Sequence, residues 1–127
     1  PLLVSLVEEG WLHDSITDQV LERYLESLKQ EDIDTLVLGC THYPLLRSSI
    51  GKIMGDSVNL VNPAYETALE LKSLLAGREL ANVRDVEEPS VMYRFYVSDA
   101  AEKFKNIANM ILPFDIKTTK QINIDEY

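Results

Sequence analysis

The chain has 127 residues, of which 46% are hydrophobic and 26% are charged, and this composition excludes a disordered or low-complexity protein. Its length is typical of one domain built around one core. The chain carries 12 Lys and Arg against 21 Asp and Glu, a net charge of -9, which repels phosphate backbones and anionic lipid head groups. We therefore expect neither nucleic acid nor a membrane among its partners.

The first 77 residues predict three units in which a short apolar strand is followed by a helix. The predicted strands cover residues 2–7, 35–38 and 57–61. The predicted helices cover residues 15–28, 44–54 and 64–75. Asp14 or Ser15 would cap the first helix, and Pro44 suits the first turn of the second, where its missing N–H costs nothing. Gly55 and Gly77 stop the second and third helices.

The remaining residues continue the alternation after a break. Residues 78–90 lose the periodicity and gain charge, so we interpret them as a connection. A fourth strand is predicted at 93–97, and Asp99 with Glu102 forms a capping-box pattern that opens a helix ended by Pro113. The tail beyond this helix alternates weakly, which predicts an edge strand. Strands that alternate with helices indicate an α/β fold with a mainly parallel sheet flanked by helices.

Cysteine usage and hydropathy predict the compartment. The single cysteine, Cys40, cannot form an internal disulfide, which indicates a reducing compartment. No apolar run approaches the roughly 18 residues of a membrane span, and the N-terminus lacks a signal-peptide pattern. We therefore expect a cytoplasmic protein. Because the sequence starts with Pro1 inside an apolar run, we also expect residues to precede it in the natural protein.

The candidate chemistry gathers at the carboxyl ends of the first two predicted strands, where parallel sheets bind ligands. Cys40 lies between a buried strand and a helix, where N–H groups and the helix dipole favour the thiolate. On spacing alone, a small buried thiol without reactivity fits Cys40 equally well. A neighbouring hydroxyl, imidazole and pair of carboxylates favour the reactive thiol; these groups belong to Thr41, His42, Glu8 and Glu9.

These residues also allow interpretations without a catalytic role, and the sequence supports neither a metal site nor a cofactor site. One alternative to a catalytic cluster is that His42 only forms a hydrogen bond at the start of the helix. Another is that Glu8 and Glu9 belong to a solvated turn. His13 has no such neighbours and is expected on the surface. One Cys and one His supply too few ligands for a metal site. The sequence also has no dinucleotide fingerprint, Walker loop or lysine placed for a Schiff base, so we expect no cofactor.

The segment from Leu36 to Leu46, LVLGCTHYPLL, resembles the second cysteine motif of the cofactor-independent glutamate racemases. Residues 1–10, with Val7-Glu8-Glu9-Gly10, resemble the stretch that precedes this motif. The likeness continues through three further segments, Asn62-Pro63-Ala64, Thr67-Ala68 and Arg94-Phe95-Tyr96-Val97-Ser98-Asp99 with Phe104. It therefore covers most of the chain. His42 favours glutamate over relatives that act on aspartate or hydantoins.

The resemblance implies half of a two-domain fold. Members of this family contain two similar α/β domains with the active site in the cleft between them, and this chain resembles the C-terminal half. Residues 1–77 would form part of the second domain and carry the cysteine motif, with 78–90 as the connection. Residues 91–127 would pack with the missing first domain. That missing N-terminal half, with an aspartate–serine motif and a first catalytic cysteine, is an expected partner, and a second copy in a homodimer is another candidate.

The resemblance also implies an isomerase that interconverts L- and D-glutamate with two bases and supplies D-glutamate for peptidoglycan. Cys40 would be the base toward the L enantiomer, His42 would assist it, and Thr41 would bind the substrate. Glu8 would hold His42, with Glu9 as the second choice, because neighbouring residues of a strand point opposite ways. The alternatives are an aspartate or other amino-acid racemase of the same superfamily, and a non-catalytic α/β module with a buried cysteine.

Overall fold

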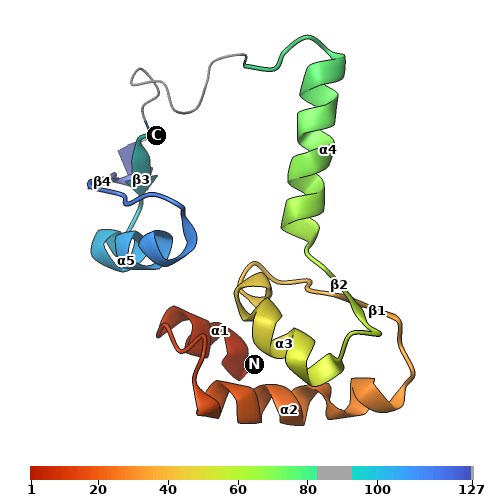
Figure 1. Cartoon of the computed structure of the whole chain (residues 1–127). Coiled ribbons are helices and arrows are strands. Elements are labelled where there is room, and N and C mark those ends of the chain that lie inside the picture. The colour runs from red at the N-terminus through yellow and green to blue at the C-terminus, as the bar shows by residue number, and fades with distance from the viewer. Residues whose placement is uncertain (83–92, 127) are drawn as a thin grey trace. The chain divides into compact units, whose positions relative to one another are not determined.

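The chain forms two units, Pro1–Ala81 and Asn82–Tyr127, in a computed structural model that describes residues 1–82 and 93–126 (Figure 1). The border between the units falls inside the predicted connection at 78–90. Residues 83–90 of this connection lie outside the described residues. Both strand pairs in the described residues are parallel, and helices predominate, so the predicted α/β class with parallel strands is confirmed.

The first element is a helix, so the strand predicted at 2–7 is wrong. In α1 (Leu2–Glu8), Leu3 and Val7 lie four residues apart and are both buried, at 8% and 1% exposed. Gly10 ends the helix with a φ of 78°, and the N–H groups of Gly10 and Trp11 each donate to a carbonyl of the last turn at 2.9 Å. A short apolar run fits a strand or a helix equally well, and the burial of both Leu3 and Val7 in one core requires the helix.

The second helix follows its prediction closely. In α2 (Ser15–Gln30), the cap is Asp14, whose Oδ1 accepts the N–H of Ile16 at 2.8 Å. The buried face carries residues at a spacing of four: Thr17, Leu21 and Leu25. The predicted cap and the predicted apolar periodicity are therefore both confirmed.

The parallel strands β1 (Thr35–Val37) and β2 (Asn59–Val61) pair in register, with Leu36 opposite Leu60. They are joined by η1 (Tyr43–Leu46), a short 3-10 helix, and by α3 (Arg47–Met54). The single helix predicted at 44–54 is thus divided into a tight turn and an α-helix.

Apolar side chains from these elements form one core. α1 packs against α2 and η1, and α2 packs against α3. The core residues are Leu3, Val7, Leu21, Leu25, Leu38, Leu46, Ile50, Met54 and Leu60. Because Leu46 of η1 and Val7 of α1 are both within this core, the packing holds the end of α1 near the loop that precedes η1.

Helix α4 (Pro63–Gly77) follows β2 (Figure 1). Its apolar residues lie on the surface of the unit. Asn62 caps it by accepting the N–H groups of Ala64 and Tyr65 at 3.1 and 3.4 Å. None of its residues is buried, and its exposed large side chains are Tyr65, Leu69, Leu71 and Leu74. The helix predicted at 64–75 is confirmed, but the core cluster of the described unit contains none of its residues.

The second unit contains β3 (Phe95–Val97), α5 (Ala101–Ile111), β4 (Thr119–Gln121) and η2 (Ile124–Glu126). The strands pair in parallel, which confirms a strand in the tail.

The capping box predicted at Asp99 and Glu102 is wrong. The residue at the helix start is Ala100, which has a φ of 49°. Asp99 accepts the N–H of Ala100 at 2.7 Å, so its carboxylate is engaged by its immediate neighbour instead of the first helical turn.

Candidate active site

Two segments of the first unit bring the candidate site residues together. Residues 38–42 form the loop between β1 and η1, and Cys40, Thr41 and His42 lie in it. Leu38 holds the start of this loop, since its N–H donates to the carbonyl of Val61 at 2.9 Å. The end is held by Tyr43, whose N–H donates to the carbonyl of Cys40 at 3.2 Å. The loop is therefore attached to the strand pair on one side and turned into η1 on the other.

His42 is the centre of the cluster. Its Nδ1 lies 3.8 Å from Cys40 Sγ and 3.2 Å from Thr41 Oγ1, while its Nε2 lies 3.4 Å from Glu8 Oε1. The side chains of His42 and Glu8 are 28% and 35% exposed, and Cys40 is half-buried. A single imidazole thus separates a thiol from a carboxylate and remains accessible to a small molecule.

Glu8 reaches His42 because it occupies the last turn of α1, which packs against η1. Consecutive residues of a helix are rotated by about 100°, so Glu8 and Glu9 face different directions. Glu8 is half-buried, whereas Glu9 is exposed. The strand alternation used to choose between them does not exist here, but the chosen residue, Glu8, is the one that contacts His42.

The predicted stabilisation of a Cys40 thiolate by a following helix has little support. The segment after the loop is η1, which has four residues, and α3 begins only at Arg47. The field of a helix end falls off within one turn. The imidazole of His42 is therefore the polar partner that the described structure provides for the thiol.

This arrangement can transfer a proton through the thiol. A carboxylate only accepts hydrogen bonds, so Glu8 favours the tautomer of His42 that carries its proton on Nε2. The other ring nitrogen, Nδ1, then carries a lone pair that can take a proton from Cys40 and later return it. The pattern of a nucleophilic or basic atom, a histidine and an orienting carboxylate is the one that activates thiols and hydroxyls in enzymes.

Thr41 is exposed, and its hydroxyl faces the ring of His42. With the His42 proton on Nε2, this hydroxyl donates to Nδ1 and competes with the thiol for the same lone pair. A substrate group that accepted the hydroxyl proton would release Nδ1 for Cys40. The predicted substrate contact of Thr41 would then also control the availability of the base.

The second histidine of the chain lies outside this cluster. His13 is exposed, as expected. Within residues 1–82 and 93–126, no group of three or more His, Cys, Asp and Glu side chains is placed to hold a metal ion. None of the helices in these ranges has the length and apolar composition needed to cross a membrane.

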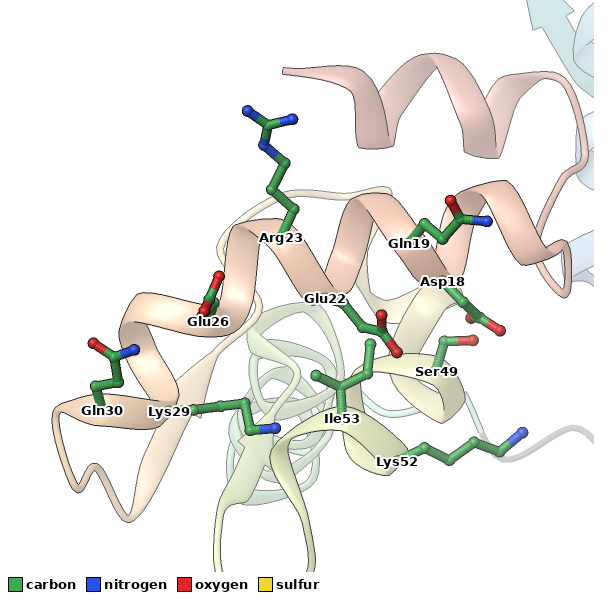
Figure 2. A pocket seen from close by; sticks show the side chains of 10 residues that line it. All are labelled: Asp18, Gln19, Glu22, Arg23, Glu26, Lys29, Gln30, Ser49, Lys52 and Ile53. Atoms are coloured by element: carbon green, nitrogen blue, oxygen red, sulfur yellow. The ribbon is translucent and has the colours of Figure 1, made fainter.

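A large open groove of about 1020 Å³ lies elsewhere, along α2 and α3 (Figure 2). It is lined by Asp18, Gln19, Glu22, Arg23, Glu26, Lys29, Gln30, Ser49, Lys52 and Ile53. Its charged lining consists of three carboxylates and three cations, and it includes none of Cys40, Thr41, His42 or Glu8. Its size alone does not make it the reaction site, because it lacks the thiol and imidazole.

Thr17 is a buried polar residue of α2 that was not among the predicted site residues. Its side chain is fully buried, and its Oγ1 donates to the carbonyl of Trp11 at 2.7 Å. The signal was its spacing of four from Leu21 and of eight from Leu25, which places a hydroxyl on the buried face of α2. A polar group on such a face requires a hydrogen-bond partner.

Comparisons with known proteins relate the chain to one enzyme family. No family model matches it. A glutamate racemase of Neisseria meningitidis serogroup A is 47% identical over 124 residues, which is 98% of this chain and 43% of the relative. This chain spans about half the length of the curated relatives it matches.

Solved structures lead to the same family. The glutamate racemase of Francisella tularensis in complex with D-glutamate has a TM-score of 0.83 and 35% identity, covering 99% of this chain and 46% of that one. The glutamate racemase of Thermus thermophilus in complex with beta-chloro-D-alanine has a TM-score of 0.84 and 30% identity, covering 100% and 47%. The predicted resemblance is confirmed over the whole chain.

Proposed function

This chain belongs to the glutamate racemase family, and we propose that it is the C-terminal half of an enzyme that interconverts L- and D-glutamate without a cofactor. The observation that carries the proposal is the position of His42, 3.8 Å from the thiol of Cys40 and 3.4 Å from the carboxylate of Glu8. Racemisation requires a weakly acidic α-proton to leave one face of the substrate and a proton to return on the other. A thiolate supported by an imidazole is suited to one of these transfers.

In this proposal Cys40 acts on the L enantiomer. Its thiolate takes the α-proton of L-glutamate, and the electron pair of the broken C–H bond remains on a planar carbanion. His42 accepts a proton from the thiol beforehand, and Glu8 holds the ring in the required tautomer. Thr41 binds a polar group of the substrate. In the reverse direction the Cys40 thiol donates its proton to the same face of the carbanion.

The second base is proposed to come from a part of the enzyme that this chain does not contain. The share of the relatives that the chain covers, 43–47%, supports this view. So do the exposed apolar residues of α4, because a soluble fold covers a helix face of this kind with another layer. Residues 91–127 would pack with the same missing N-terminal half. A second copy in a homodimer is the other partner we propose.

The remaining proposals follow from the family. The complex of the Francisella tularensis relative with D-glutamate supports glutamate as the substrate. D-glutamate is a building block of peptidoglycan, so the enzyme would supply cell-wall synthesis and influence cell shape. Such a supply, together with the single cysteine, supports the cytoplasm as the compartment.

The test is a racemisation assay of the intact protein in deuterated water. L-glutamate is supplied without pyridoxal phosphate or metal, and the optical signal and α-deuterium content are followed together. We expect the optical signal to decay toward zero while deuterium enters the α-position. Activity that required pyridoxal phosphate or a metal would contradict the cofactor-independent mechanism. Racemisation of L-aspartate in place of L-glutamate would favour the alternative substrate.

A further inference from the structure

In the loop between α1 and α2, the backbone of Trp11 is hydrogen-bonded to both helices. Its N–H donates to the carbonyl of Leu6 in α1 at 2.9 Å, and its carbonyl accepts the hydroxyl of Thr17 in α2 at 2.7 Å. Both bonds act on one residue, so the end of α1 is tied directly to the first turns of α2. Glu8 occupies that end of α1.

Thr17 has no access to solvent, whereas Glu8 is partly exposed. A buried hydroxyl cannot replace its hydrogen bond to the protein with one to water, so the bond to Trp11 is a persistent constraint. Glu8 belongs to the last turn of α1, so the position of that turn sets how close its carboxylate lies to His42. A small rotation of the last turn of α1 would lengthen the 3.4 Å separation between Glu8 Oε1 and His42 Nε2.

We propose that Thr17 is a positioning residue for the active site. Its hydroxyl fixes the end of α1 through the carbonyl of Trp11 and thereby keeps Glu8 against His42. Thr17 acts only through Glu8 and does not touch the thiol. The inference rests on the proposed function in one respect, namely that His42 and Glu8 together support the reactivity of Cys40.

Two substitutions separate the hydroxyl from the shape of the side chain. Thr17→Val keeps the volume and removes the hydroxyl, while Thr17→Ser keeps the hydroxyl and removes a methyl group. The readout is the rate at which iodoacetamide alkylates Cys40 in the intact protein at neutral pH, followed by mass spectrometry of the peptide that carries Cys40. This reaction requires no turnover, so it remains informative whether or not the protein racemises glutamate.

We expect Thr17→Val to slow alkylation measurably, by up to about fivefold, which is the upper limit for losing the Glu8 contact itself. Thr17→Ser should react like the parent. In a Glu8→Gln background, Thr17→Val should have no further effect. A rate lower in Thr17→Ser than in Thr17→Val would assign the effect to packing and overturn the inference. So would an unchanged rate in Thr17→Val, or a further loss in the Glu8→Gln background.

A second variant keeps the inference testable if Thr17→Val does not fold. Gly10→Ala places a side chain at a φ of 78° and strains the same link from the side of α1. It should also slow alkylation only while Glu8 is present. If the enzyme racemises glutamate but neither variant shows this dependence on Glu8, the positioning role fails and the proposed function stands.

Discussion

Replacing Glu8 by Gln removes the carboxylate that lies 3.4 Å from His42 Nε2 and leaves a side chain of equal size. The amide of Gln can donate as well as accept a hydrogen bond, so it no longer selects the tautomer that leaves Nδ1 free. The loss also removes the attraction that favours a positive ring after His42 takes the proton of Cys40. We therefore expect a slower reaction of Cys40 with iodoacetamide.

The size of this effect follows from exposure. The Glu8 and His42 side chains are 35% and 28% exposed, so water screens their interaction. Ion pairs in such positions contribute about 0.2–1 kcal/mol, which corresponds to a change of about 1.4- to 5-fold in a rate or equilibrium. A buried pair would lose far more, because one partner would remain charged without compensation.

Glu9→Gln is the matched control. It changes the net charge by the same amount at the next residue of the chain, which is exposed. The alkylation rate of Cys40 should remain near that of the parent in this variant, and urea unfolding checks that both variants are folded. Equal losses in both variants would refute the specific contact and leave only a general effect of charge. A loss above 100-fold in Glu8→Gln would refute the magnitude worked out for a screened, partly exposed pair.

Three further predictions test the site and the core. Cys40→Ser in the intact enzyme should abolish both α-proton exchange and turnover, whereas His42→Asn should lower turnover by about 10²–10⁴-fold. Near-parent turnover of Cys40→Ser would show that Cys40 is structural. The 127-residue chain alone should form no D-glutamate from L-glutamate, although it could exchange the α-proton; sustained inversion would contradict the two-base mechanism. Leu21→Ala, at a fully buried position, should lower the free energy of unfolding by about 2–5 kcal/mol in urea denaturation, against less than about 0.5 kcal/mol for the exposed Ile16→Ala.

Local sequence signals predicted the helices well because their causes are local. Asp14 caps α2 with its own carboxylate, and Asn62 does the same for α4. Gly55 ends α3 because its positive φ suits a residue without a Cβ. The exception at Ala100 has a local cause as well, since the Asp99 carboxylate bonds to the next N–H before it can reach the helix.

The first helix shows where local signals were insufficient. Seven residues contain fewer than two periods of a helix, so their apolar pattern also fits a buried strand. The core decided between them. Leu3 and Val7 both enter it from one side of α1. In a strand, two residues four apart lie on the same face as the residue midway between them, so that residue would be buried as well. That residue, Ser5, is exposed.

The sequence by itself determined the chemical groups of the site, because Cys40, Thr41 and His42 are adjacent and any fold of that loop keeps them together. Only the tertiary structure decided which carboxylate joins them. Glu8 meets His42 because α1 packs on η1, and the buried Thr17 ties the end of α1 to α2 through Trp11. Such contacts depend on how separate segments share one core, and no local pattern in any single segment contains that information.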